Sequence, residues 1–260
     1  MEWFDTHAHL FDEGLLPQID DVLGRAQEAG VGTIVAIGTT LEDSRICVEL
    51  AERFPQVYAS VGIHPNHSAE AQEGDLDEVE QLIPHPKVVA IGETGLDRYW
   101  DFAPIELQKQ YLAWHVEKSR AYGKPLVIHM RDCEDDIVQW LEASKADGPL
   151  SGILHSYTGN VQLAELGVAC GMHISFAGML TFKRNQELRD VAKTIPDDRL
   201  LVETDCPYLS PEPCRKQRPN EPALVVHTGT CLANERGIDP AEMARITTAN
   251  ARKLFGIAQS

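Results

Sequence analysis

Short apolar runs rich in β-branched residues alternate along this chain with longer segments of helical period. A strand followed by a helix and then by another strand is the repeating unit of a parallel sheet. Eight such units are present, with expected strands at residues 3–7, 33–37, 57–61, 88–93, 126–129, 152–155, 173–176 and 200–203. This pattern predicts an α/β protein that forms a single (β/α)8 barrel, also called a TIM barrel, over residues 1–260 as one domain.

The segments between the strands predict helices. They lie at residues 17–29, 41–53, 105–122, 133–146 and 222–236, and a C-terminal helix follows at 240–255. The alternative architecture is a doubly wound open sheet, which would carry a glycine-rich nucleotide turn. Gly92-Glu93-Thr94-Gly95 does not match the G-x-G-x-x-G pattern of that turn, and no linker divides the chain. The barrel is therefore favoured.

The charge of the chain limits its partners. Forty Asp and Glu residues against 23 Lys and Arg residues give a net charge of -17, which opposes general adhesion to a nucleic-acid backbone or an anionic membrane. Any contact with nucleic acid must then be local. No apolar run approaches the roughly 20 residues that span a bilayer. The six cysteines form no CxxC pair and are interpreted as reduced thiols. We expect a cytoplasmic protein with no membrane association and no obligate protein partner.

Histidines and carboxylates stand at or just after the ends of the expected strands. They are His7, His9, His64, Glu93, His129, His155 and Asp205. Barrel enzymes place their chemistry at the carboxyl ends of the strands, which open at one face. Any one of these residues could be a satisfied core or loop group. Seven in register are harder to explain in that way, so we expect them to converge and to hold cations.

The number of ligands favours two divalent ions over one. Four histidines and two carboxylates exceed the three protein ligands of a typical catalytic metal site. The expected ligands are His7, His9 and Asp205 on one side, and His129 and His155 on the other. Glu93 would bridge the two ions and Asp205 would accept a proton from an acidified water, which makes these two carboxylates the expected catalytic residues.

Six motifs of the chain resemble the TatD family of metal-dependent deoxyribonucleases. They are Phe4-Asp5-Thr6-His7-Ala8-His9, Gly62-Ile63-His64-Pro65, Gly92-Glu93-Thr94-Gly95-Leu96-Asp97, His129-Met130-Arg131, His155-Ser156-Tyr157-Thr158-Gly159 and Glu203-Thr204-Asp205-Cys206-Pro207-Tyr208-Leu209. They occur in the family's order and cover nearly the whole chain. The resemblance implies a TIM barrel of the amidohydrolase superfamily, with metal positions at His7, His9, Glu93, His129, His155 and Asp205.

The resemblance also implies hydrolysis of phosphodiesters, as a deoxyribonuclease or 3′ to 5′ exonuclease that acts on DNA, and RNA is left open as a second substrate. Imidazole ligands favour zinc and other transition ions, whereas such phosphodiesterases often use manganese or magnesium, so the two ions are expected to be Zn, Mn or Mg. The first alternative is a metal-dependent ester or amide hydrolase, acting on a lactone or an aminoacyl-tRNA ester with the same ions. The second is a metal store or scaffold that has kept the ligands and lost turnover.

Two residues near the expected ligands are candidate substrate contacts. His64 could donate to a phosphate oxygen, or it could stabilise its turn. Arg98 departs from the aromatic residue that the family often has at this position. It could bind a phosphate through two hydrogen bonds, or it could form an ion pair with Asp97 or Asp101.

Loops that follow the expected strands supply further cations. Arg131, Lys183 and Arg218 are the candidate phosphate contacts, although surface loops carry basic residues in any case. Aromatic residues in the same loops could stack on bases, or could pack in the wall of the site. They are Tyr99, Trp100, Tyr157, Phe182 and Tyr208.

Overall fold

The computed structural model describes residues 2–258. The strands are β1 (Trp3–Ala8), β2 (Val31–Ile37), β3 (Val57–Val61), β4 (Val88–Asp97), β5 (Leu126–Arg131), β6 (Gly152–Leu154), β7 (Met172–Phe176) and β8 (Leu200–Val202). The α-helices are α1 (Ile19–Glu28), α2 (Leu41–Arg53), α3 (Asp75–Leu82), α4 (Ile105–Tyr122), α5 (Glu134–Ser144), α6 (Val161–Ala169), α7 (Gln186–Thr194), α8 (Val225–Arg236) and α9 (Pro240–Phe255). The 3-10 helices are η1 (Leu16–Gln18), η2 (Pro65–His67), η3 (Lys145–Asp147), η4 (Gly178–Thr181), η5 (Asp197–Arg199) and η6 (Pro222–Leu224).

The eight strands belong to one sheet whose order is the order of the sequence. The strand pairs with a described register are parallel. The predicted (β/α)8 fold with a C-terminal helix is confirmed. None of the described helices is both long and apolar enough to cross a membrane.

The contacts between residues divide the chain into two compact units. One comprises residues 36–155 and 166–172, and the other comprises the described residues of 1–35, 156–165 and 173–260. The expectation of a single domain over residues 1–260 stays a prediction.

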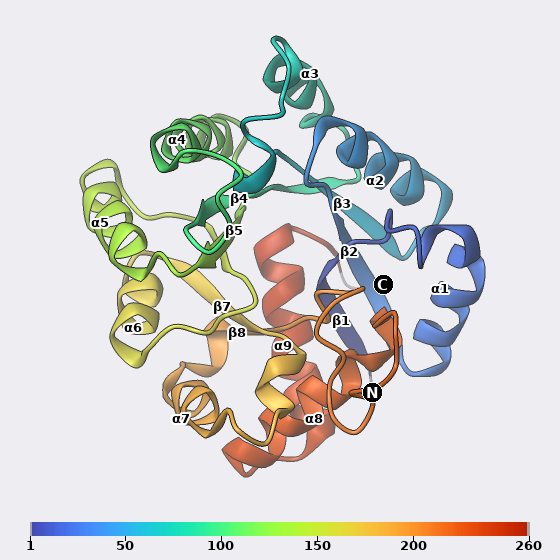
Figure 1. The fold of residues 1–260 in the computed structure, drawn as a ribbon. Coiled ribbons are helices and arrows are strands. Elements are labelled where there is room, and N and C mark those ends of the chain that lie inside the picture. The colour runs from blue at the N-terminus through green and yellow to red at the C-terminus, as the bar shows by residue number, and fades with distance from the viewer. Residues whose placement is uncertain (1, 259–260) are drawn as a thin grey trace. The chain divides into compact units, whose positions relative to one another are not determined.

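In the unit of residues 36–155, helices cover the outer side of the strands. α2 packs on β3 and α4 packs on β4, and in Figure 1 α2 to α5 lie outside β3, β4 and β5. α2 begins where the Thr40 side chain accepts a hydrogen bond from the backbone N–H of Asp43 at 3.1 Å, which caps the first turn. α4 ends at Gly123, whose φ of 64° is left-handed and favours glycine.

β4 is longer than the sequence predicted. We expected it to end at Glu93, and it continues to Asp97. Gly95 has a φ of +142°, and a Cβ atom there would lie 2.1 Å from the carbonyl oxygen of His129 on β5. The close approach of the two strands therefore requires glycine, the residue that weakens a strand prediction. The other predicted boundaries differ from the structure by three residues or fewer.

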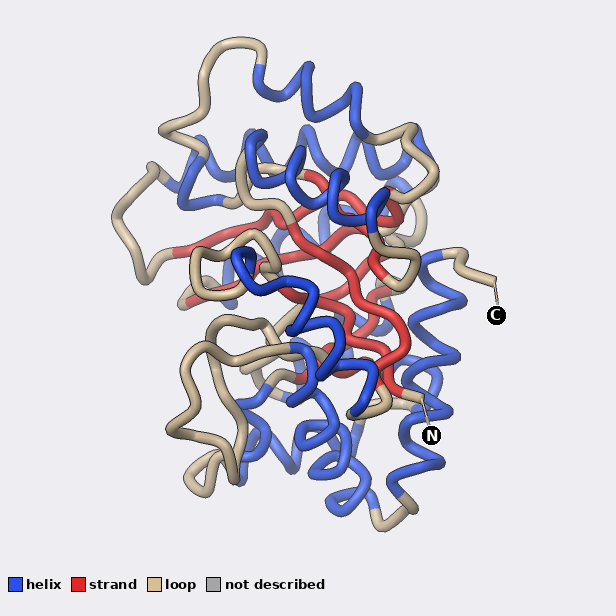
Figure 2. The backbone as a smooth tube through the Cα atoms, turned by 90° about the vertical axis from the view of Figure 1, so that its right-hand side faces the viewer, coloured by secondary structure: helices blue, strands red, loops and turns tan. Residues whose placement is uncertain are grey.

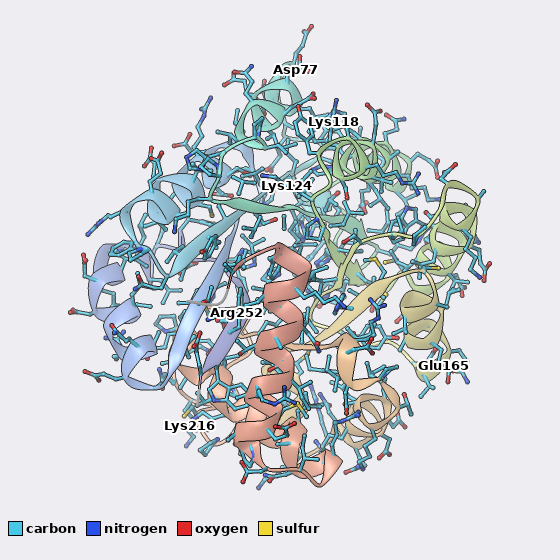
Figure 3. All side chains as sticks on the ribbon, turned by 180° about the vertical axis from the view of Figure 1, so that it is seen from behind. Asp77, Lys118, Lys124, Glu165, Lys216 and Arg252 are labelled. Atoms are coloured by element: carbon cyan, nitrogen blue, oxygen red, sulfur yellow. The ribbon has the colours of Figure 1, made fainter. Side chains whose placement is uncertain are left out.

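In the other unit, α9 lies across the amino ends of β1 and β8. The Phe255 ring stacks on Phe4 with 5.7 Å between the centroids, and Asn250 Nδ2 donates to the carbonyl of Leu200 at 3.0 Å. Arg252 of α9, labelled in Figure 3, forms an ion pair with Glu2 just before β1. In Figure 2 the helix that ends near the label C is α9, and it runs beside the start of the chain. The carboxyl ends of β1 and β8 lie at the opposite side from α9.

Substitution of Gly229 by alanine tests the packing of α8 on β1. Trp3 is fully buried, and a Cβ atom at Gly229 would lie 2.2 Å from its ring. Because β1 carries this ring in the core, we expect Gly229→Ala to lower the free energy of unfolding by about 1–3 kcal/mol. Gly24→Ala in α1 is the matched control, since nothing lies within 4 Å of its added methyl group. It should raise stability by about 0.5–1 kcal/mol. Urea denaturation measures both, and equal stability of the two variants would contradict the packing described.

Candidate metal centre

The end of β1 and the segment after β8 bring three donor side chains together. His7 and His9 are two residues apart on an extended backbone and point to the same side. Their Nε2 atoms lie 3.2 Å apart, and Asp205 Oδ1 lies 3.7 Å from Nε2 of His7 and 3.4 Å from that of His9. One ligand atom from each residue lies within 4.8 Å of the others. These three residues fit one cation, as the sequence predicted for this set.

Backbone hydrogen bonds fix Asp205 beside the two histidines. Its N–H donates to the carbonyl of His7 at 2.9 Å, and the N–H of His9 donates to the carbonyl of Cys206 at 2.8 Å. The φ of Asp205 is 55°, in the left-handed region that Asp and Asn adopt more readily than most residues. This turn of the backbone directs the carboxylate toward the histidines.

Asp5 supports this set and was not among the residues expected from the sequence. Its buried carboxylate accepts hydrogen bonds from the N–H of Thr204 at 2.9 Å and from the Thr204 hydroxyl at 2.6 Å. Burial raises the pKa of Asp5 to about 7, although the hydrogen bonds from Thr204 act in the opposite direction. Asp5 therefore ties β1 to the segment that carries Asp205. An acidic residue inside an apolar strand was the signal available in the sequence.

Glu93 on β4 is the centre of a second set, within the unit of residues 36–155. Its Oε1 atom lies 2.8 Å from Nε2 of His155, 2.9 Å from Nδ1 of His129 and 3.4 Å from Nε2 of His64. All three histidines follow or end strands of this unit, as the sequence predicted. The carboxylate is buried, and one of its oxygens faces three imidazoles. A buried anion in this position is compensated by a cation or by protonated imidazoles.

Asp97 orients His129 and is the residue that the sequence analysis missed. Asp97 Oδ2 lies 2.9 Å from Nε2 of His129, and it also accepts a hydrogen bond from Asn66 Nδ2 at 3.1 Å. Burial would raise the pKa of Asp97, but the hydrogen bonds from His129, from the Trp100 amide and from Asn66 outweigh it and lower that pKa to about 2. A carboxylate on one imidazole nitrogen is the usual support of a histidine that binds metal through the other.

His64 differs from the other histidines of this set in its tautomer. The N–H of Asn66 donates to Nδ1 of His64 at 3.1 Å, so the proton of the neutral ring lies on Nε2, which faces Glu93. Burial, together with the neighbouring His129, lowers the pKa of His64 to about 4, and the ring is neutral at pH 7. His64 also lies in a group with Glu93 and His129 whose ligand atoms are close enough to hold a cation. The hydrogen bond from Asn66 stabilises the turn that begins η2, as the alternative for His64 expected, and the substrate contact stays a prediction.

The two arginines predicted in this unit have different surroundings. Arg98 forms two hydrogen bonds with the carboxylate of Asp136, at 2.6 and 3.1 Å, and does not pair with Asp97 or Asp101 as the alternative had suggested. The Arg131 guanidinium lies 3.7 Å from the centre of the Tyr99 ring. Their roles as phosphate contacts stay predictions.

Lys183 and Arg218 lie on neighbouring loops of the other unit. Arg218 Nη1 donates to Ser210 Oγ at 2.8 Å and to carbonyls of its own loop. The Arg215 guanidinium lies 3.6 Å from the centre of the Phe182 ring, which precedes the exposed Lys183. The structure thus brings the loops that follow β7 and β8 into contact. The predicted binding of phosphate by Lys183 and Arg218 is not tested by these contacts.

The donor sets fit divalent transition ions. Each combines imidazole nitrogens with a carboxylate oxygen, and three protein donors are the number that a catalytic metal site commonly uses. Mixed nitrogen and oxygen ligands suit zinc and manganese better than they suit calcium.

Comparisons with known proteins show the family to which the chain belongs. The family model described as TatD related DNase matches residues 4–256. An uncharacterized metal-dependent hydrolase of Bacillus subtilis, YabD, is 38% identical over 254 residues, which cover 98% of this chain and 99% of the relative. A protein of Shigella flexneri named 3′-5′ ssDNA/RNA exonuclease TatD is 34% identical over 259 residues, covering 98% and 99%. The crystal structure of YJJV, a TatD homologue from Escherichia coli, has a TM-score of 0.92 and 29% identity, and the match covers 98% of each chain.

Proposed function

Because the chain belongs to the family of TatD-related DNases, we propose that it is a divalent-metal-dependent nuclease that removes nucleotides from the 3′ end of single-stranded DNA or RNA. The observation that carries the proposal is the buried Glu93 carboxylate, one oxygen of which faces three imidazoles. The name of the Shigella flexneri relative supports the choice of substrate. The cytoplasmic location expected from the sequence stays a prediction.

The two donor sets would serve one centre. In a (β/α)8 barrel the carboxyl ends of all strands open at the same face. His7 lies near the carboxyl end of β1 and Asp205 follows β8, while Glu93 and His129 lie in the carboxyl-terminal halves of β4 and β5 and His155 follows β6. On this basis we propose that residues 1–260 form a single domain that holds two ions, with Glu93 as the shared ligand.

The residues of the chain have distinct roles in this proposal. When bound, the divalent ions would stabilise the developing charge on the phosphoryl group and lower the pKa of water. Asp205 would accept a proton from the attacking water, and His64, neutral with its proton on Nε2, would donate to a phosphate oxygen. Asp97 would hold the ring of His129 in place. The other residues proposed to bind the substrate phosphates are Arg98, Arg131, Lys183 and Arg218.

The alternative is hydrolysis of a carboxylic ester or amide by the same ligands. Those ions would polarise a carbonyl group equally well. The family and its relative named as an exonuclease favour the phosphodiester. A scaffold without turnover is the remaining alternative, and any measured turnover excludes it.

A product assay distinguishes these functions. Metal-loaded protein is incubated with DNA and RNA strands labelled at either end, and with a panel of lactones and other small esters. We expect release of mononucleotides from the 3′ end, with no product from the Glu93→Gln variant. Intact nucleic acid together with acid and alcohol from the ester panel would reject the nuclease proposal.

Removal of the metal should abolish hydrolysis. We expect protein as purified to contain at least about half an equivalent of a transition metal, because imidazoles form much of both donor sets. Dialysis against a chelator should remove both the metal and the activity, and manganese or magnesium should restore the activity. The melting temperature should fall on chelation, since a ligand that binds only the folded state stabilises it. Full activity in metal-free protein would contradict the proposal.

A further inference from the structure

Three large aromatic side chains are exposed on one short loop after β4. Tyr99 is 52% exposed, Trp100 is 43% exposed and Phe102 is 58% exposed. Tyr157, by contrast, is buried in the wall of the fold. Exposed apolar side chains that lie together mark an interaction site more often than ones that lie singly. We call Tyr99, Trp100 and Phe102, together with Arg131, the aromatic platform.

The rings of the platform are ordered against one another. Trp100 stacks on Phe102 with 5.3 Å between the centroids and 10° between the planes, and the edge of Tyr99 meets Trp100 at 4.8 Å. The Arg131 guanidinium lies 3.7 Å from the centre of the Tyr99 ring and 5.7 Å from that of Trp100. Among residues 2–258 no ion pair involves Arg131, and its exposed guanidinium contacts these two rings. The platform thus offers flat apolar faces beside a positive charge.

The platform is anchored to the candidate metal centre through one side chain. The backbone N–H groups of Tyr99 and Trp100 donate to Asp97 Oδ1 at 2.8 and 3.0 Å. The other oxygen of Asp97 lies 2.9 Å from Nε2 of His129. The loop is also tied at its start, where the N–H of Arg98 donates to the carbonyl of Arg131 at 2.9 Å. The loop that carries the platform is therefore held by the same carboxylate that contacts His129.

We propose that the aromatic platform binds the bases of the single-stranded nucleic acid that the enzyme degrades, with Arg131 against a phosphate. This inference rests on the proposed nuclease function. Stacking of a base on an aromatic side chain strengthens binding by roughly 5- to 150-fold per base and tolerates any sequence. A chain with a net charge of -17 gains little from general attraction to phosphates. Binding of nucleic acid by this chain therefore depends on local contacts such as the stacking of bases on aromatic side chains.

A binding experiment with two strands tests the platform. The probes are fluorescent ten-nucleotide strands with phosphorothioate linkages that resist hydrolysis, one of thymidines and one of abasic sites. Their charges are equal, so the ratio of their dissociation constants reports the contribution of the bases. We expect the metal-loaded protein to bind the thymidine strand at least about fivefold more tightly, and Trp100→Ala to remove most of that preference. Trp100→Phe should keep most of it.

Tyr122→Ala is the matched control. Tyr122 is an exposed aromatic residue at the end of α4, 37% exposed and hydrogen-bonded to Glu80, and it is not part of the platform. Its removal should leave the ratio unchanged. Circular dichroism and metal analysis confirm that each variant is folded and loaded.

The outcomes separate the two proposals. Equal binding of both strands by the wild type, or an unchanged ratio in Trp100→Ala, would overturn the platform even if the protein hydrolyses DNA. If Trp100→Ala weakens binding to another protein and leaves the binding of both strands unchanged, the aromatic platform is a site for a protein partner. That result would also overturn the proposal. A preference for bases that depends on Trp100, without any hydrolysis, would support the platform and reject the proposed nuclease function.

Discussion

We expect Glu93→Gln to lower the rate of hydrolysis of single-stranded DNA by more than about 100-fold, because even the residues that support metal ligands are commonly worth 10- to 100-fold in activity or metal affinity. The substitution keeps the shape of the side chain and removes the charge that faces His129 and His155. Since we propose Glu93 as the shared ligand, both ions should be lost. Elemental analysis and a 3′-labelled strand measure the two effects.

Glu106→Gln is the control for this substitution. Glu106 lies in the first turn of α4, is exposed and pairs with Lys109 at 3.1 Å. It should retain both the metal and the activity. If Glu93→Gln kept two equivalents of metal and wild-type turnover, the proposed centre would be wrong.

We expect Asp205→Asn to lower kcat by about 10²- to 10⁴-fold, the usual contribution of the general base that we propose Asp205 to be. Asparagine preserves the volume of the side chain and tolerates the left-handed φ of 55° at this position, so the fold is expected to remain intact. Asp205 belongs to the set with His7 and His9 and not to the set around Glu93. At most one of the two proposed ions should therefore be lost, in contrast to Glu93→Gln.

Asp132→Asn is the control for the backbone conformation of Asp205. Asp132 also has a left-handed φ, of 52°, and is exposed in the turn after β5. It should show activity close to that of the wild type in the same assay. Loss of activity in both variants would attribute the effect to the backbone, and wild-type kcat in Asp205→Asn would reject its role as the base.

The periodicity of the sequence was sufficient for the fold because each strand and helix buries one apolar face. The boundaries of α2, α4 and β3 were predicted to the residue. The ends of the strands then located the donors, since a histidine or carboxylate after an apolar run has few other places to lie in a barrel. The structure brings these residues together around Glu93 and around Asp205, and their role as metal ligands stays a prediction.

Asp97 shows where such reasoning stops. The expected strand ended at Glu93, before Gly95, so Asp97 lay outside it. Counted along the strand, Glu93, Gly95 and Asp97 alternate with period two and share one face. That alternation was present in the sequence, but the reason for the glycines, the close approach of β5, depends on residues far along the chain.

Contacts between distant segments were the second limit. The pairing of Arg98 with Asp136 depends on where α5 begins relative to the end of β4, and no local pattern encodes it. The exposure of Trp100 beside the burial of Tyr157 is of the same kind. Both residues are aromatic and follow a strand, and only the packing of the surrounding helices separates their environments.

The position of α9 has a practical consequence for immobilised enzyme. This helix covers β1 and β8 at the ends opposite to those that carry His7 and Asp205. A support that held the protein through the outer surface of α9 would thus lie at the ends of β1 and β8 away from these residues. A long polymer in the mobile phase could then approach the carboxyl ends of these two strands without passing the support.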